Sequence, residues 1–198
     1  MRTLLTRSHG PRSLLGAFAI ATLILAPAAH ATILNYSATL DGPSESPPNA
    51  STGLGAAAVT IDDVALTMHV VVDFEGLVGT TTASHIHGPT LVAGTGTAGV
   101  ATTTPTFTGF PLGVTSGHYD HTFDLTQSSS YNPAFITANG GTVATAMPVL
   151  LQAIADGKAY LNVHSSVYGG GEIRGFLQPG LATPTTNSTW GRIKSLYR

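Results

Sequence analysis

Apolar and polar residues alternate along most of the chain between residues 32 and 180. The clearest segment is residues 65–74, in which every second residue is apolar: Leu66, Met68, Val70, Val72 and Phe74. This period of two is typical of a β-strand with one buried face. Segments of similar character span residues 32–40, 53–61, 85–87 with the residues before them, 99–103, 116–125, 159–164 and 172–177. With Gly, Pro and Asn between them, these segments predict an all-β fold, a Greek-key-like β-sandwich or barrel.

One segment has the features of a helix, and we expect one short helix near residues 146–156. Thr145 can cap its N-terminus, and Gly157 can end it. Between them, three apolar side chains recur at helical spacing: Leu150, Leu151 and Ile154. The predicted domain is therefore a β-fold with a single helical segment.

The first 31 residues have the pattern of a secretory signal peptide. Three arginines among the first 12 residues precede an uncharged apolar run over residues 14–26. Ala29 and Ala31 then give the small-x-small pattern that signal peptidase accepts. A membrane anchor is the alternative, but the run is shorter than the roughly 20 residues that span a bilayer. We therefore expect cleavage after Ala31 and an exported protein that is secreted, periplasmic or at the cell surface, without a membrane span.

Residues 32–180 form one expected domain, and residues 181–198 form a flexible basic tail after it. The domain carries all ten acidic residues but only two basic ones, Lys158 and Arg174. A negatively charged surface repels nucleic acid, so a nucleic-acid partner is excluded. The chain has no Cys, which excludes disulfides, thiolate metal sites and a cysteine nucleophile. The sequence also contains no nucleophile elbow, phosphate-binding loop or dinucleotide fingerprint.

The sharpest chemical feature is the pair His85 and His87. Residues two apart on a strand point to the same face, so the two imidazoles lie side by side. His164 ends another expected strand, just before the glycines at 169–171. Imidazole nitrogen is a good ligand for copper, zinc or nickel, and these three histidines are therefore a candidate metal site. The alternative is that they are solvated or hydrogen-bonded polar side chains.

Two further histidines, His118 and His121, are weaker candidates for completing a site. In the alternating pattern His121 falls on the core face of its strand, while His118 and Asp120 fall on the solvent-exposed face and can form a surface pair. Glu172 and Arg174 share a strand face, which predicts a structural ion pair. The functional alternative is that Arg174 draws an anion toward a metal.

Three motifs together resemble the CHRD domain first described in chordin. They are Ser84-His85-Ile86-His87-Gly88-Pro89, residues 159–165 (AYLNVHS) and residues 168–177 (YGGGEIRGFL). The resemblance covers roughly residues 32–178. It implies an exported β-sandwich, and in chordin-like proteins the domain is thought to be a protein-interaction module.

A more distant similarity is to copper–zinc superoxide dismutase, in which an alternating strand and Gly-Leu precede an H-x-H motif. Here these features correspond to residues 70–74, to residues 76–77, and to His85 and His87. The similarity implies that His85, His87 and His164 match copper ligands and that Arg174 matches an anion-guiding arginine. The zinc ligands and the disulfide of that family have no counterpart, so at most a copper-only site is implied. Both superoxide-dismutase-like and immunoglobulin-like sandwich topologies are compatible with the strand pattern.

Three hypotheses about function follow. The first is a non-enzymatic exported module that binds a metal ion, with copper favoured over zinc, or a partner such as an extracellular protein or matrix component. The second is a copper-only oxidoreductase similar to superoxide dismutase. The third is a structural or adhesion domain of a matrix, in which the histidines hold no metal.

Overall fold

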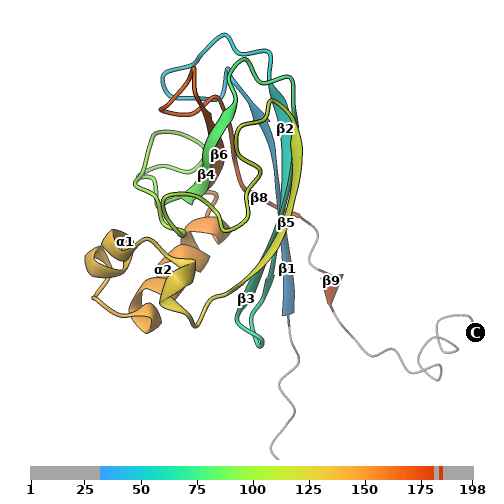
Figure 1. Ribbon diagram of the computed structural model, residues 1–198. Helices are drawn as coiled ribbons and strands as arrows, with labels where there is room; N and C mark the ends of the chain where they lie inside the picture. The colour runs from blue at the N-terminus through green and yellow to red at the C-terminus, as the bar shows by residue number, and fades with distance from the viewer. Residues whose placement is uncertain (1–31, 181–182, 185–198) are drawn as a thin grey trace, which may run out of the picture.

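The computed structural model describes residues 32–180 and 183–184 (Figure 1). The expected signal peptide, residues 1–31, lies outside the described residues, as do residues 181–182 and 185–198 of the expected tail. The two described tail residues, Thr183 and Pro184, pair with Ile33 and Thr32. Within the described part of the chain, no helix is long and apolar enough to cross a membrane.

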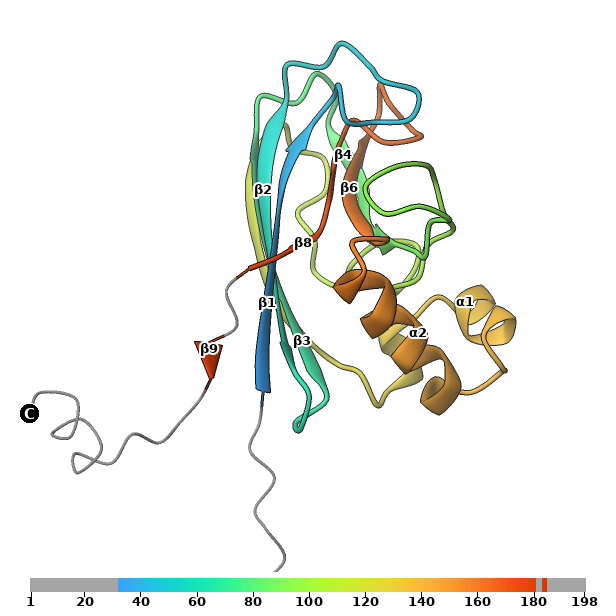
Figure 2. The ribbon, with the colours of Figure 1, turned by 180° about the vertical axis from the view of Figure 1, so that it is seen from behind.

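The strands form one antiparallel sheet that curls on itself, which confirms the expected all-β sandwich or barrel (Figures 1 and 2). The strands are β1 (Thr32–Asp41), β2 (Leu54–Asp62), β3 (Thr67–Glu75), β4 (Thr81–His87), β5 (Gly117–Asp124), β6 (Tyr160–Ser165), β7 (Ile173–Phe176), β8 (Gln178–Pro179) and β9 (Thr183–Pro184). Their order is β4-β6-β7-β1-β2-β3-β5, with β8 and β9 pairing with β1. The curl brings β4 and β6 opposite the long strands β2, β3 and β5.

The core lies between these two parts of the sheet and contains the apolar residues that the alternating pattern selects. On β3, Met68, Val70 and Val72 are fully buried. On the opposite part, the buried side chains come from the inner faces of three strands, namely Ile86, Leu161, Val163 and Ile173. Removing this apolar surface from water is the main source of stability for the fold. The alternate residues of β4, β6 and β7 face outward.

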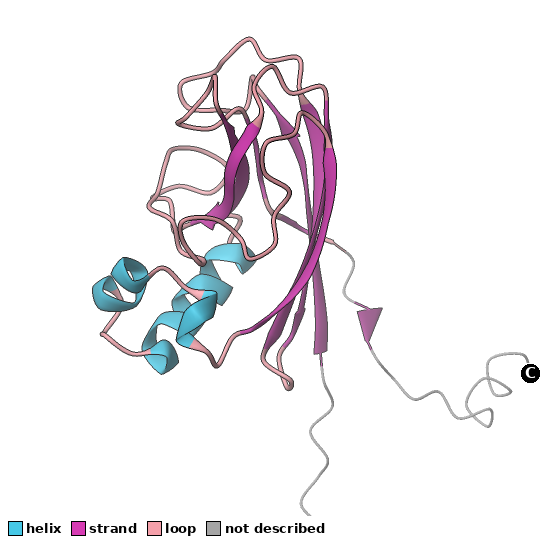
Figure 3. Ribbon diagram, in the orientation of Figure 1, coloured by secondary structure: helices cyan, strands magenta, loops and turns pink. Residues whose placement is uncertain are grey.

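The helical part differs from the expectation of a single helix. Two helices, α1 (Pro133–Ala138) and α2 (Val143–Ala155), lie together at one end of the sandwich (Figure 3). Helix α2 begins three residues before the expected range because Thr142, not Thr145, is its N-cap, and Thr145 completes a capping box with it. Helix α1 is only six residues long, too short for a periodic apolar stripe to reveal it in the sequence. A 3-10 turn, Ser128–Ser130, precedes it.

The expected strand over residues 99–103 is also wrong. These residues belong to a long connection between β4 and β5 and make only isolated bridges, from Val100 to His87 and from Thr102 to Tyr131. The connection runs beside β4 and forms irregularly spaced backbone hydrogen bonds with it, such as those from the Ala101 N–H to the Ile86 carbonyl and from the Phe107 N–H to the Ser84 carbonyl. Because these hydrogen bonds do not form a regular ladder, the segment covers the edge of the sheet without becoming a strand.

Candidate metal centre

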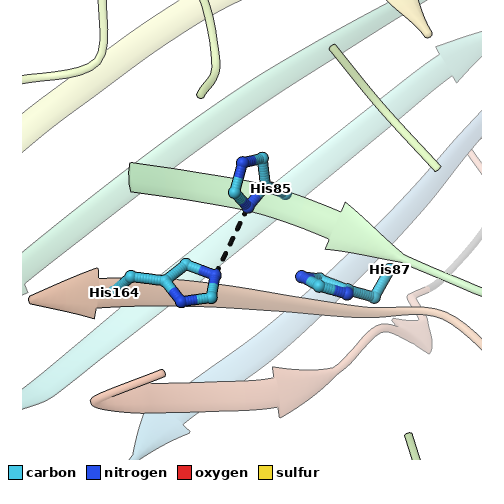
Figure 4. Close-up of side chains that lie close together, drawn as sticks. All are labelled: His85, His87 and His164. Carbon is cyan, nitrogen blue, oxygen red and sulfur yellow. Dashed lines mark hydrogen bonds between the residues drawn. The ribbon is translucent and has the colours of Figure 1, made fainter. Parts of the chain in front are cut away.

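Strands β4 and β6 bring the three expected histidines together on the outer face of the sheet (Figure 4). His85 and His87 are two residues apart on β4, and the register places Ala83 of that strand opposite His164 on β6. The Nδ1 atom of His85 lies 3.3 Å from the Nε2 atom of His164. One ring nitrogen from each of the three lies within 4.8 Å of the others. We call His85, His87 and His164 the three-histidine centre.

Each ring of the centre is held by a backbone carbonyl on its far side. The three contacts are His85 Nε2 to the Pro105 carbonyl (2.6 Å), His87 Nδ1 to the Ala98 carbonyl (2.9 Å) and His164 Nδ1 to the Gly169 carbonyl (2.9 Å). A carbonyl only accepts hydrogen bonds, so each of these ring nitrogens carries the hydrogen. In the neutral rings the other nitrogens, which face one another, therefore carry lone pairs. This is how outer partners fix the tautomer of a metal-binding histidine.

The inward nitrogens have no hydrogen to share. The 3.3 Å contact between His85 Nδ1 and His164 Nε2, dashed in Figure 4, has the distance of a hydrogen bond, but in the neutral rings both atoms are acceptors, so no hydrogen lies between them. The Nε2 atom of His87 is buried and has no hydrogen-bond partner. An orphaned buried acceptor is costly, and two facing acceptors repel. A bound cation would satisfy all three lone pairs, so the residues present fit a metal ion.

Burial keeps the three rings neutral. Desolvation lowers the pKa of His87 to about 4, against a weaker opposing effect of its bond to Ala98. Desolvation likewise lowers the pKa of His85 and that of His164. Metal ions bind the deprotonated imidazole, so the centre is ready to bind a metal at neutral pH without first losing protons.

An aromatic and a cationic side chain support the centre from beside it. The ring of Tyr160 stacks on His87, with centroids 4.8 Å apart and planes 6° from parallel. The guanidinium of Arg174 lies 4.7 Å from the centroid of the Tyr160 ring. These contacts fix the His87 ring in place. Tyr160 is absent from the sequence-based candidates, although it stands two and four residues before Asn162 and His164 and so shares their face.

His118 and His121 lie on β5 and do not join the three-histidine centre. His118 is exposed and pairs with Asp73 across the strands at 2.7 Å, and His69 pairs with Asp120 at 2.8 Å. The expected pair of His118 with Asp120 is therefore wrong, because residues opposite each other on neighbouring strands lie closer than residues two apart on one strand. His121 is half-buried against the Phe123 ring, with centroids 4.6 Å apart.

The expected ion pair between Glu172 and Arg174 is also wrong. Glu172 precedes β7 and is fully buried, where its carboxylate accepts hydrogen bonds from the Ser51 hydroxyl at 2.6 Å and the Gly79 N–H at 3.1 Å. Arg174 instead lies 3.8 Å from the carboxylate of Glu45 and donates to the carbonyls of Ser44 and Gly96. Glu45 comes from the loop after β1, and its role has no signal in the local sequence.

Comparison with known proteins gives one match. The model of the CHRD domain family matches residues 36–177, well over half of the chain. The comparisons with curated proteins and with solved structures give no match. The family match contains β4, β6 and β7, and with them all three histidines of the centre.

Proposed function

Because this chain belongs to the CHRD domain family, whose members are generally extracellular, we propose that it is an exported, non-enzymatic module that binds a divalent metal ion. The ion is held by the three-histidine centre. The observation that carries the proposal is the set of three inward lone pairs, each fixed by a carbonyl on the far side of its ring. The signal-peptide pattern of residues 1–31 supports export.

The donor set favours copper. Three imidazoles suit copper, zinc and nickel, and among divalent first-row ions the affinity of a given nitrogen site is highest for Cu²⁺. Zinc is the alternative, since it binds histidine with equally good geometry. Calcium and magnesium prefer oxygen ligands and are disfavoured by this set.

Binding is a better-supported role than catalysis. A copper-only dismutase-like reaction would use Arg174 to guide an anion, which requires its charge to face the approach to the metal. Arg174 is 5% exposed, lies beside Glu45 and donates to two backbone carbonyls. These contacts favour a structural role for Arg174. A metal-free structural or adhesion domain is the remaining alternative, and an extracellular protein or matrix component is the class of partner that we propose.

The test is the metal content and affinity of the untagged chain, exported and purified without chelators. We expect one Cu²⁺ per chain by mass spectrometry and calorimetry, with Zn²⁺ bound more weakly. The variants His85→Ala and His87→Ala should abolish stoichiometric binding. His118→Ala is the matched control, because His118 is exposed and lies outside the centre, and it should bind as the wild type does. Equal losses in His87→Ala and His118→Ala, or no binding by the wild type, would contradict the proposal.

A further inference from the structure

Three buried side-chain atoms in the described part of the chain have no hydrogen-bond partner: Glu45 Oε1, His87 Nε2 and Asn162 Oδ1. Buried polar atoms are nearly always paired, because leaving one unpaired costs about 1–3 kcal/mol. All three residues belong to, or adjoin, the outer face of β4, β6 and β7, where the three-histidine centre lies. Their common position suggests a common cause.

Asn162 is at the middle of this group. It is 1% exposed, and the register places it opposite His85 on one side and Arg174 on the other. His164 follows it by two residues on the same strand, so both side chains point to the same face. The amide is therefore built into the sheet beside the three-histidine centre.

The amide of Asn162 has a defined orientation. Its Nδ2 atom lies on the side of Glu45, because a Cβ atom placed at Gly171 would contact both Asn162 Nδ2 and Glu45 Oε1. The Oδ1 atom is therefore on the opposite side of the amide, where it is buried without a hydrogen-bond partner. The Asn162 side chain also affects the pKa of both Glu45 and His87, as expected for a group that lies near both.

Gly171 makes the approach of Glu45 to Asn162 possible. A Cβ atom at this position would collide with Glu45 Oε1 and would lie 2.8 Å from Asn162 Nδ2. The two side chains therefore meet over the bare backbone of Gly171, whose φ of 134° also disfavours any other residue. Two residues earlier in the same turn, the Gly169 carbonyl holds His164. The glycines after His164 thus both leave room for Glu45 beside Asn162 and hold the His164 ring.

We propose that Asn162 presents its amide oxygen as a fourth donor to the ion in the three-histidine centre, and that Glu45 is the positioning residue that keeps the oxygen turned inward. This inference rests on the proposed metal binding. It explains why Asn162 Oδ1 and His87 Nε2, two buried acceptors from the same face of the sheet, both lack a hydrogen-bond partner. A cation satisfies both atoms.

Glu45 sets the orientation in its ionised form, because a carboxylate has no donor. Its oxygens attract the NH₂ group of Asn162, which leaves Oδ1 for the ion. In Glu45→Gln, the guanidinium of Arg174 attracts the new amide oxygen, and the new NH₂ group is left to face Asn162. The Asn162 amide then turns so that its oxygen accepts from this group and its NH₂ faces the histidines, where it repels a cation.

The experiment measures Cu²⁺ affinity by competition calorimetry and the Cu²⁺ environment by electron paramagnetic resonance. Loss of a residue that supports a metal site typically costs 10–100-fold in affinity. We expect a loss of about that size in Asn162→Leu and in Glu45→Gln, each with an altered spectrum, and no further loss when the two are combined. The double variant Glu45→Gln with Asn162→Asp restores an oxygen facing the ion and should regain at least the wild-type affinity.

Thr81→Val is the matched control, because Thr81 is a buried polar residue of β4 whose hydroxyl bonds to the Pro111 carbonyl, away from the centre. It should leave affinity and spectrum unchanged. Wild-type Cu²⁺ binding with unchanged affinity and spectrum in Asn162→Leu and Glu45→Gln would overturn this inference and leave the three-histidine site intact. No binding by the wild type would overturn both. Should Asn162→Leu not fold, the isosteric variants Glu45→Gln and Glu45→Gln with Asn162→Asp decide the outcome.

Discussion

The metal-free protein should lose stability in acid through His87, by an amount that its burial sets. His87 is 8% exposed, and desolvation lowers its pKa to about 4 in the folded protein, against about 6.5 in the unfolded chain. Between these values the unfolded chain binds a proton that the folded protein does not. The stability that His87 contributes is therefore complete above about pH 6.5 and is lost as the pH falls toward 4.

The size of the effect follows from the two pKa values. Each pH unit between the two pKa values corresponds to about 1.4 kcal/mol, and lowering the pH from about 7.5 to 5 covers about 1.5 units below 6.5. The titration of His87 alone should therefore lower the free energy of unfolding by about 2 kcal/mol. Glu45 acts in the opposite direction, because burial raises the pKa of its carboxyl to about 7, against the charge of Arg174. The wild-type profile by itself is therefore not diagnostic.

The assay compares variants, so that the contribution of Glu45 cancels. Urea unfolding of the metal-free wild type and of His87→Gln gives the free energy of unfolding at about pH 7.5 and 5. The variant should lose about 2 kcal/mol less than the wild type over this interval, because glutamine does not titrate. In His118→Gln, which removes an exposed histidine, the loss of unfolding free energy over the same interval should differ from that of the wild type by less than about 0.5 kcal/mol. A His87→Gln profile parallel to the wild-type profile would refute the reasoning.

Four other predictions concern the fold and the site. Leu161→Ala removes a fully buried side chain from the inner face of β6 and should lower the free energy of unfolding by about 2–5 kcal/mol in a urea titration. Gly175→Ala places a Cβ against the Thr39 carbonyl where β7 approaches β1, and should cost at least about 1–3 kcal/mol, seen as a lower Tm. Thr142→Ala breaks the capping box of α2 and should cost about 1 kcal/mol by the same measurement; no change would contradict the assigned cap. Binding of Cu²⁺ to the wild type should weaken only well below pH 6.5, because burial lowers the pKa of all three histidines, and weakening that starts above pH 6.5 would contradict this.

The alternation of residues predicts most strands correctly, because the side-chain period of a strand is a local property. The pattern over residues 65–74 selects the buried face of β3, including Met68, Val70 and Val72. The same rule places His85 and His87 on one face. The pattern fails where local structure depends on contacts elsewhere, as in α1 and in the connection around Val100, which follows the edge of β4 without a ladder.

The partners across strands are what the sequence leaves undetermined. His118 is nearer in sequence to Asp120 but pairs with Asp73, and Arg174 is nearer to Glu172 but lies beside Glu45. The sequence of a strand shows which of its residues share a face, but it does not show which strand lies next to it or in what register the two pair. Those choices depend on how the whole sheet buries its apolar faces at once.

The sequence by itself therefore determined an all-β chain with two histidines on one strand face and a third at the end of another strand. Only the tertiary structure decided that β6 lies beside β4 in a register that brings His164 to His85. It also decided that Asn162 and a loop glutamate, Glu45, adjoin the centre. Alternation along a strand is a property of neighbouring residues, whereas contacts between residues about 80 or more positions apart depend on the closure of the whole core.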